Sequence, residues 1–428
     1  MTVVIVGGGW SGLAAAITLS DNGIPVHLIE SAKQLGGRAR NVSWQDKVID
    51  NGQHLMIGAY DHMLALMSLI DIDHSKLFKR YPIDITIVDD IFTPLRISAK
   101  GGLPWPLSLA WNVFRCAGLS AVVQLVRLQR DIPKLLANND MSVADWLHRT
   151  KQSQRLIKQL WQPLCLATLN TPIANASAHV LAHVLNDSLG QDQAAADLLI
   201  PQQPLGTLFP QPAATFLIKN GAKISLGCRV KQLIDDNGQI TGIITNDGNT
   251  YFADHVIIAA GPAHCAELLA PMLAMTKPDE LPICTVYLQY RQEVRLAAPM
   301  LGLSGTHSQW IFDRSLQHPG LMAVVISGPG SHESLSKQAL IDCVSAEVHQ
   351  LIPSMPAQAE SAFVIREKRA TFASTIAYQQ QRPTHKTSTK GLWLAGDFVA
   401  NNYPATLEGA IRNGEQCAHA ILAEQNLT

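Results

Sequence analysis

The chain has 428 residues, of which 47% are hydrophobic and only 16% are charged, and its formal net charge is −1. This length is enough for a large core and predicts two domains. A net charge close to zero gives no overall attraction to nucleic acid, so we expect no nucleic-acid partner. The seven cysteines form no CxxC pair, which favours reduced thiols in the cytoplasm over a disulfide framework.

The first thirty residues are predicted to form a strand, a turn, a helix and a second strand. Only two residues precede the first strand, so we expect no secretory signal peptide. Gly7, Gly9 and Gly12 form a GxGxxG motif directly after that strand. In a dinucleotide-binding turn these glycines allow a tight turn, close approach of a pyrophosphate and close helix packing, respectively. Glu30 ends the second strand, where a carboxylate accepts a hydrogen bond from an adenosine ribose.

A second glycine-rich segment, LGGRAR at 35–40, follows the acidic strand and contains Gly36, Gly37 and Arg38. It resembles the GGR stretch of flavoproteins in the amine oxidase and phytoene desaturase superfamily, where this stretch approaches the pyrophosphate of FAD. The resemblance implies an α/β fold, with a Rossmann-like FAD domain of the glutathione-reductase type and a mixed α+β substrate domain. The alternative is a glycine-rich turn with solvated arginines.

The most apolar long segment is 103–130, which Arg115 interrupts. No run of about 18 uncharged apolar residues occurs, so we expect no transmembrane helix. One interpretation is a buried helix that caps the core. The other is a surface that enters a bilayer, with three apolar anchors and three cations near the head groups: Trp105, Trp111, Phe114, Arg115, Arg127 and Arg130. We expect a cytoplasmic protein, with peripheral attachment to the inner face of the membrane left open.

The segment 222–262 is predicted to form short strands with turns at 236–238 and 246–248, followed by a buried strand that stops at Gly261. Taken alone, this pattern indicates only an antiparallel meander. The superfamily resemblance places the backbone of Val230 against the adenine and the turn at Gly261 near the dinucleotide.

The last forty residues repeat the strand–loop–helix pattern. A buried strand ends at Gly396 and Asp397, and a helix is predicted to begin at Pro404. By resemblance, Asp397 holds a ribityl hydroxyl or a phosphate-bridging water. Thr406 and Leu407, in the first helical turn, lie at the flavin edge where negative charge accumulates on reduction.

The cofactor domain is therefore predicted to be discontinuous. It comprises 1–75, 205–270 and 386–428, whereas 76–204 and 271–385 form the substrate domain with a helical cap. The cofactor is expected between the two lobes, where ligand sites commonly form.

Several further stretches narrow the family: DNGQHLMIGAY at 50–60, the segments 164–190 and 196–210, and YPATLEGAIRNGE at 403–415. Together they resemble bacterial hydroxysqualene dehydroxylases, also called squalene-associated FAD-dependent desaturases, over nearly the whole chain. The resemblance implies reduction of hydroxysqualene, a long isoprenoid, to squalene in hopanoid biosynthesis. A carotenoid-type desaturase or isomerase and a non-catalytic, flavin-bearing lipid-binding subunit are the alternatives. No linkage motif and no second dinucleotide fingerprint occur, which favours non-covalent FAD and an external electron donor.

Dehydroxylation needs an acid for the leaving hydroxyl, a dry pocket and a hydride from flavin N5. In the superfamily the strand after DNG runs over the flavin ring, which implies that Gln53 and His54 lie near N5. His54 is the first candidate for the acid because an imidazole titrates near neutral pH; alternatively, it caps a backbone carbonyl. Asp187 and Asp192 are rival acids, and each can also be a solvated or helix-ending carboxylate.

The sequence does not predict a metal site. His179 and His183 are four residues apart, but no glutamate follows the first histidine and no third ligand is evident.

Overall fold

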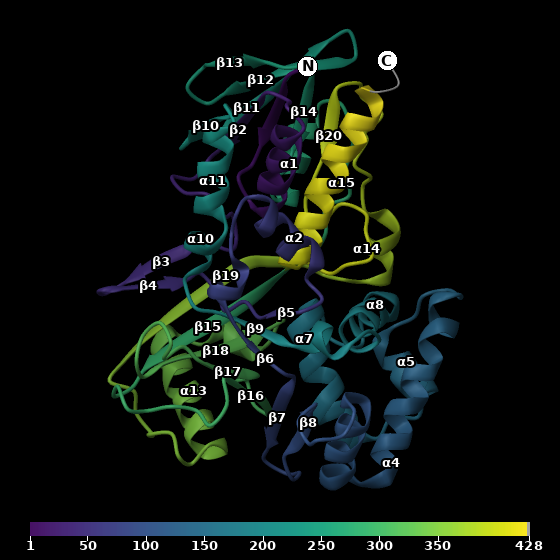
Figure 1. Ribbon diagram of the computed structural model, residues 1–428, viewed down its shortest axis with the longest axis vertical. Coiled ribbons are helices and arrows are strands. Elements are labelled where there is room, and N and C mark those ends of the chain that lie inside the picture. Colours follow the sequence, from purple (N-terminus) through teal and green to yellow (C-terminus); the bar gives the residue numbers. More distant parts are fainter. Residues whose placement is uncertain (426–428) are drawn as a thin grey trace.

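A five-stranded parallel sheet forms one end of the molecule in this computed structural model, which describes residues 1–425 (Figure 1). Its strand order is β10-β2-β1-β14-β20. The strands are β1 (Val3–Val6), β2 (Val26–Glu30), β10 (Lys223–Leu226), β14 (His255–Ile258) and β20 (Leu392–Leu394). All five come from the three segments predicted for the cofactor domain, although the boundaries of those segments stay a prediction.

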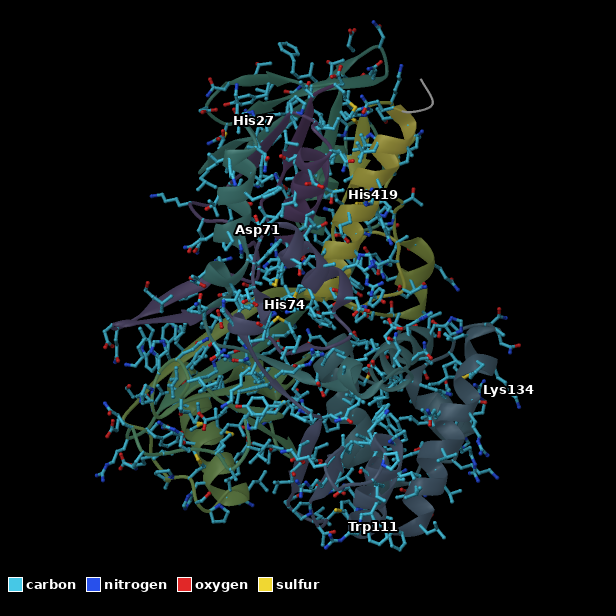
Figure 2. The ribbon with its side chains drawn as sticks, viewed as in Figure 1. His27, Asp71, His74, Trp111, Lys134 and His419 are labelled. Carbon is cyan, nitrogen blue, oxygen red and sulfur yellow. The ribbon has the colours of Figure 1, made fainter. Side chains whose placement is uncertain are left out.

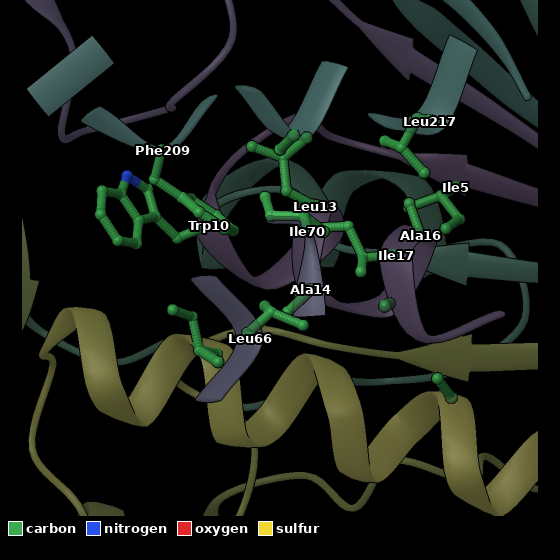
Figure 3. Close-up of a cluster of buried hydrophobic side chains, with 14 of the residues drawn as sticks. Ile5, Trp10, Leu13, Ala14, Ala16, Ile17, Leu66, Ile70, Phe209 and Leu217 are labelled. Carbon is green, nitrogen blue, oxygen red and sulfur yellow. The ribbon is translucent and has the colours of Figure 1, made fainter. Parts of the chain in front are cut away.

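Helix α1 (Trp10–Asp21) is buried along almost its whole length against this sheet. It also packs against α15 (Leu407–Gln425) and α11 (Pro210–Lys219), with α2 (Asp61–Leu69) close by. Figure 3 shows Leu13 and Ile17 of α1 in this core, together with Leu66 of α2. A helix that is apolar all round is stable only where other elements cover every side, which explains the run AAAI in α1.

An antiparallel meander lies at the outer end of this part of the molecule (Figure 1). Its strands are β11 (Val230–Asp236), β12 (Gln239–Thr245) and β13 (Thr250–Phe252). The turns between them fall at the two predicted Asn/Asp-Gly sites, and α12 (Pro262–Leu269) follows β14. The predicted meander is confirmed.

The second large sheet has seven strands in the order β19-β15-β18-β17-β16-β7-β8. All neighbours are antiparallel except β16 and β7. Helix α13 (Lys337–Leu351) packs on one face. The strands are β7 (Asp84–Asp89), β8 (Leu95–Ser98), β15 (Glu280–Gln289), β16 (Met300–Ser304), β17 (Trp310–Asp313), β18 (Leu321–Ser327) and β19 (Ser361–Phe372).

The helices of the predicted substrate domain lie beside this sheet (Figure 1). They are α4 (Trp105–Leu136), α5 (Val143–Arg149), α6 (Gln154–Leu156), the π-helix η1 (Ile157–Trp161), α7 (Gln162–Leu169), α8 (Ala178–Leu189) and α9 (Gln193–Ala196). Helix α4 is broken at Gly118, which has φ 80° and ψ 175°, a conformation that only glycine adopts readily.

The structure bears on two expectations for 103–130. Within the described residues, α4 is the one helix whose length and apolar composition would allow it to cross a membrane, and the expectation that no helix does so stays a prediction. The interpretation as a buried cap helix is wrong over most of its length, because only 11% of its most apolar window is buried.

Short elements connect the two lobes. Strands β3 (Asn41–Trp44) and β4 (Lys47–Asp50) form a hairpin, whereas β9 (Leu198–Pro201) lies between β5 (Met56–Ile57) and β6 (Phe78–Tyr81). Asp50, at the end of β4, forms a buried ion pair of 3.1 Å with Arg314 of the substrate lobe. The remaining short helices are α3 (His74–Leu77), α10 (Leu205–Leu208), α14 (Ile376–Gln381) and the 3-10 helix η2 (Ser331–Ser334).

Candidate active site

The two glycine-rich segments form one cradle at the start of α1. Gly36 donates a hydrogen bond to the carbonyl of Gly8 at 2.9 Å, and Gly36 also forms a parallel bridge with Gly9. A Cβ built on Gly9 would meet only the Cα of Gly37, at 3.9 Å. No side chain caps the N-terminus of α1. Its free N–H groups and positive dipole end therefore face a backbone surface without side chains, as a pyrophosphate requires.

Gly7 and Gly12 are required for close packing inside the protein. Gly7 has φ 114°, and a Cβ on it would lie 2.6 Å from the carbonyl oxygen of Ala259. A Cβ on Gly12 would lie 2.0 Å from the carbonyl oxygen of Gly7. Gly261, the N-cap of α12, is instead exposed and has open space beside it. The structure thus brings the predicted Gly261 turn next to the N-terminal glycines through Ala259.

Glu30 lies at the same edge of the sheet and is buried. Its carboxylate accepts hydrogen bonds from the backbone N–H of Gly8 at 2.6 Å and of Ala32 at 2.7 Å. The carbonyl of Glu30 accepts from the N–H of Cys228, which brings the start of β11 at Val230 close by. Because a carboxylate has about four acceptor positions, Glu30 can still accept from a ribose hydroxyl.

Arg38 and Asp397 join the two ends of the chain. One guanidinium nitrogen of Arg38 lies 2.6 Å from the carboxylate of Asp397, and the other donates to the carbonyl of Ala370 at 2.8 Å. Asp397 is almost fully buried, whereas part of Arg38 faces the cavity described below. The backbone N–H of the preceding Gly396 donates a hydrogen bond to the side-chain oxygen of Asn413 on α15. The predicted Gly396–Asp397 turn therefore lies directly beside the LGGRAR segment.

Helix α15 begins at Leu407, three residues later than predicted. The hydroxyl of Thr406 accepts a hydrogen bond from the N–H of Gly409 at 3.1 Å and so caps the helix. Threonine is a favoured N-cap residue, and this local signal outweighs the preference of Pro404 for a first helical turn. Thr406 and Leu407 line the cavity, so the N-terminus of α15 still points into the site.

A cavity of about 350 Å³ separates the cradle from the seven-stranded sheet. Strands β15, β17 and β18 and helices α7 and α8 contribute to its walls. The walls are largely aliphatic, with Leu55, Ile57, Ile85, Val184, Leu198 and Met300 among the lining residues. A concave apolar site with a few polar groups is typical of a small-molecule pocket.

Gln53, His54 and Asp187 all line the cavity, whereas the position of Gln53 and His54 near flavin N5 stays a prediction. They lie on the loop after Asp50 and on α8. Asp192 does not line it: its side chain is exposed and accepts from the N–H of Ala195 at 3.0 Å as the cap of α9. The expectation that Asp192 is a rival acid is therefore wrong, because its carboxylate caps the N-terminus of α9 outside the cavity.

The structure also corrects the expectation for His54. Burial, together with the positive charges of Arg38 and Arg314, lowers the pKa of His54 to about 4. The imidazole is then neutral at pH 7 and carries no extra proton to give to a leaving group. The loop itself lies beside the Asp50–Arg314 pair, and Asn51 donates to the carboxylate of Glu367 at 3.1 Å.

Sequence reasoning missed Tyr403, which is the hydrogen-bond partner of Asp187 in the cavity. The phenol of Tyr403 donates a 2.5 Å hydrogen bond to the carboxylate of Asp187. Burial and the contact with Asp187 raise the pKa of Tyr403, so the phenol keeps its proton. Arg412 packs over the Tyr403 ring and forms a 2.6 Å ion pair with the buried Glu408. The position of Tyr403 just before the C-terminal helix was the available signal.

The histidine pair considered for a metal does not assemble a site. The ring of His179 contacts the carbonyl of Leu135 at 2.9 Å. Elsewhere among residues 1–425, His307, Cys343 and Glu347 lie close together. The Glu347 carboxylate there accepts from the backbone N–H of His307 and Ser308, which is a structural role.

Residues 10–422 match the family model described as flavin containing amine oxidoreductase. The chain belongs to this family. A hydroxysqualene dehydroxylase of Sinorhizobium fredii is 28% identical and is covered over 99% of both chains. The enzyme of that name from Rhodopseudomonas palustris is 28% identical, covering 99% of this chain and 98% of the other. A 15-cis-phytoene desaturase of Glycine max is 21% identical, covering 100% of this chain and 80% of the other.

Solved structures show the same fold. An oxidoreductase from Methanosarcina mazei has a TM-score of 0.77 at 16% identity, covering 99% of this chain and 100% of that chain. A triple mutant of putrescine oxidase has a TM-score of 0.74 at 14% identity, with the same coverage. The predicted fold class, an FAD-binding α/β domain with mixed α+β content, is confirmed.

As a member of this flavin-containing family, the protein is an FAD-dependent oxidoreductase. The residues present fit the cofactor. The cradle has no side chains where the pyrophosphate must lie, and, within residues 1–425, the buried Ser11 Oγ near the start of α1 and Gln53 Oε1 at the cavity have no hydrogen-bond partner. Non-covalent attachment and the use of an external electron donor stay predictions.

Gly9→Val and Gly12→Val should separate cofactor binding from folding. A Cβ on Gly9 makes only one ordinary van der Waals contact, with Gly37 Cα at 3.9 Å, so Gly9→Val should fold normally but bind no FAD, because the side chain occupies the pyrophosphate position. A Cβ on Gly12 meets Gly7, so Gly12→Val should lose both FAD and stability. Flavin absorbance per chain and thermal unfolding measure the two effects. Full flavin occupancy in folded Gly9→Val would contradict this site, and denaturation of the wild type should release all FAD.

Proposed function

We propose that this oxidoreductase reduces hydroxysqualene to squalene, or performs the same dehydroxylation on a closely related isoprenoid. The observation that carries the proposal is the largely aliphatic cavity lying against the predicted flavin cradle, with one carboxyl–phenol pair inside it. Relatives named hydroxysqualene dehydroxylase align with this chain from end to end. A long hydrocarbon fits such walls because it makes no hydrogen bonds and gains from leaving water.

The reaction breaks one C–O bond, uses one proton to release water and adds one hydride to carbon. Reduced FAD, when bound, would supply the hydride, and an external donor would restore the reduced cofactor. The proton that leaves with the hydroxyl is assigned to the Asp187–Tyr403 pair, in which the phenol keeps its proton and donates a hydrogen bond to the carboxylate. Tyr403 donates its hydrogen bond to Asp187 and so fixes the direction in which that carboxyl group points.

His54 acts differently in this proposal from the acid predicted from sequence. Its lowered pKa keeps the imidazole neutral, so it places no positive charge beside a carbon that is becoming cationic. Water that reached this carbon would add to it and form an alcohol again. The aliphatic walls keep water away from it.

A desaturase working in the opposite redox direction is the second candidate, since phytoene desaturases also align with the whole chain. The cavity contains Asp187 with its hydrogen-bonded phenol, and removal of a hydroxyl uses a proton donor whereas hydride abstraction from a hydrocarbon does not. This difference favours dehydroxylation.

The direction of the reaction should distinguish the two candidates. Dithionite-reduced enzyme mixed anaerobically with hydroxysqualene should yield squalene and oxidised flavin, one turnover per FAD. The oxidised enzyme should add no double bonds to squalene or phytoene. Product analysis with flavin absorbance makes both measurements, and a desaturated product from the oxidised enzyme would move the second candidate to first place.

Comparing Asp187→Asn with His54→Gln should show which of the two side chains takes part in proton delivery. Asp187→Asn should keep FAD but lose turnover by roughly 10²–10⁴-fold, the usual range for a general acid. His54→Gln should stay within about tenfold of the wild type, and the pH profile above about pH 5 should not change, because His54 is already neutral there. Asp192→Asn, which alters an exposed helix cap, is the matched control and should be nearly as active as the wild type. Loss of activity in His54→Gln with retention in Asp187→Asn would contradict the assignment.

A further inference from the structure

The first half of α4 presents an apolar tip to solvent. Leu107, Trp111 and Phe114 follow one another at helical spacing and are 57%, 52% and 42% exposed, respectively. The rings of Trp111 and Phe114 stack on each other at 5.6 Å rather than on the core. Figure 2 shows Trp111 at the lower end of the molecule, opposite the five-stranded sheet. A contiguous exposed apolar cluster of this kind marks an interaction surface.

The second half of α4 continues this surface after the break at Gly118. Leu119, Val123 and Val126 lie on one helix face and are 65%, 49% and 37% exposed. Arg127 and Arg130 extend the same face toward the C-terminal end of α4. We call the exposed residues 107–130 of this helix the α4 surface.

The charges around the α4 surface are predominantly positive. The segment 100–136 contains five basic residues and one acidic residue, Asp131. Asp131 is already paired with Arg149 and accepts from the indole of Trp146. Within residues 1–425, no ion pair involves the exposed cations Arg115, Arg127, Arg130 or Lys134. Apolar anchors beside unpaired cations match the interface of a membrane with anionic head groups.

The buried side of α4 is compatible with a helix that lies on a membrane and not with one that crosses it. Val113, Ala121, Leu128 and Ile132 are buried against the protein, where α4 packs on β8 and α8. The break at Gly118 also prevents one straight span. A helix fixed to its own domain along both halves can bring only its outer face into the lipid interface.

The α4 surface is connected to the substrate cavity through a shared wall. Trp105 and Leu109 of α4 belong to the same apolar cluster as Ile83, Ile85 and Ile97. Those three isoleucines line the cavity. Lipid contact at α4 would therefore lie one layer of side chains from the pocket.

We propose that the α4 surface docks this enzyme on a lipid bilayer that carries anionic head groups. Trp111 and Phe114 of the α4 surface enter the lipid interface. Arg115, Arg127 and Arg130 lie at the level of the head groups. The benefit of docking rests on the proposed function, since a long isoprenoid resides in the bilayer; the docking itself depends only on the α4 surface.

Cosedimentation of the FAD-loaded enzyme with vesicles tests the proposal without any substrate. The wild type should bind vesicles of phosphatidylcholine mixed with phosphatidylglycerol, and bind phosphatidylcholine alone more weakly. The double variant Trp111→Ser/Phe114→Ser should lower the partition coefficient by at least about tenfold, because two aromatic anchors are lost. Arg127→Gln/Arg130→Gln should lower it by roughly tenfold on anionic vesicles only, and high salt should imitate this effect.

Phe252→Ser is the matched control, because Phe252 is 73% exposed on β13 at the other end of the molecule and should not affect vesicle binding. Flavin content and melting temperature should be the same in all variants. Wild-type protein that stays in the supernatant, or a Trp111→Ser/Phe114→Ser variant that binds like the wild type, would overturn the proposal. So would light scattering that shows a dimer broken by Trp111→Ser/Phe114→Ser without vesicle binding, since the surface would then contact a second copy of the chain. Failure of the squalene assay with intact vesicle binding would instead contradict only the proposed function.

Discussion

The ion pair between Arg38 and Asp397 connects two parts of the chain that are far apart in sequence, and the candidate site depends on it. Arg38 belongs to the glycine-rich segment that packs on the first turn, and Asp397 follows β20, the last strand of the parallel sheet. The carboxylate is buried, so its charge must be compensated inside the protein. Loss of either partner would leave the other group without its direct ion pair, with only Arg382 acting on Asp397 and Glu280 and Glu367 acting on Arg38. The ion pair thus fixes the position of the N-terminal glycines relative to the start of α15, so that both can contact one cofactor.

A second buried pair, Asp50–Arg314, has the same effect between the two lobes. Asp50 also accepts from the N–H of Leu205, and its carbonyl accepts from the phenol of Tyr287. These contacts position the loop that carries Gln53 and His54 against the seven-stranded sheet. The positive charge of Arg314 then contributes to the low pKa of His54. Burial and Arg38 lower the pKa of His54 more, so this interaction between the lobes adds a smaller contribution in the same direction.

Local backbone requirements made much of the cradle predictable from sequence. Gly7, Gly9 and Gly12 fall at positions where a tight turn, a phosphate and a close helix each exclude a side chain, so their spacing alone indicates the site. The charge state of His54 was not predictable, because it depends on burial and on an arginine from the other lobe. The Asp187–Tyr403 contact joins residues 216 positions apart, so the position of Tyr403 before the C-terminal helix could not indicate its partner. Apolar composition likewise could not show which face of α4 would remain uncovered.

A double-mutant cycle on FAD affinity tests the central claim that Arg38 and Asp397 act as one unit in holding the cofactor. Arg38→Ala, Asp397→Ala and the double variant would be compared with the wild type by titrating apoprotein with FAD and following flavin fluorescence. Each single substitution should weaken binding about ten- to a hundredfold, because each removes a charge-assisted hydrogen bond. The double variant should bind little worse than the weaker single variant, since the second substitution removes an interaction already lost. Fully additive losses, or an unchanged dissociation constant in both single variants, would contradict the account.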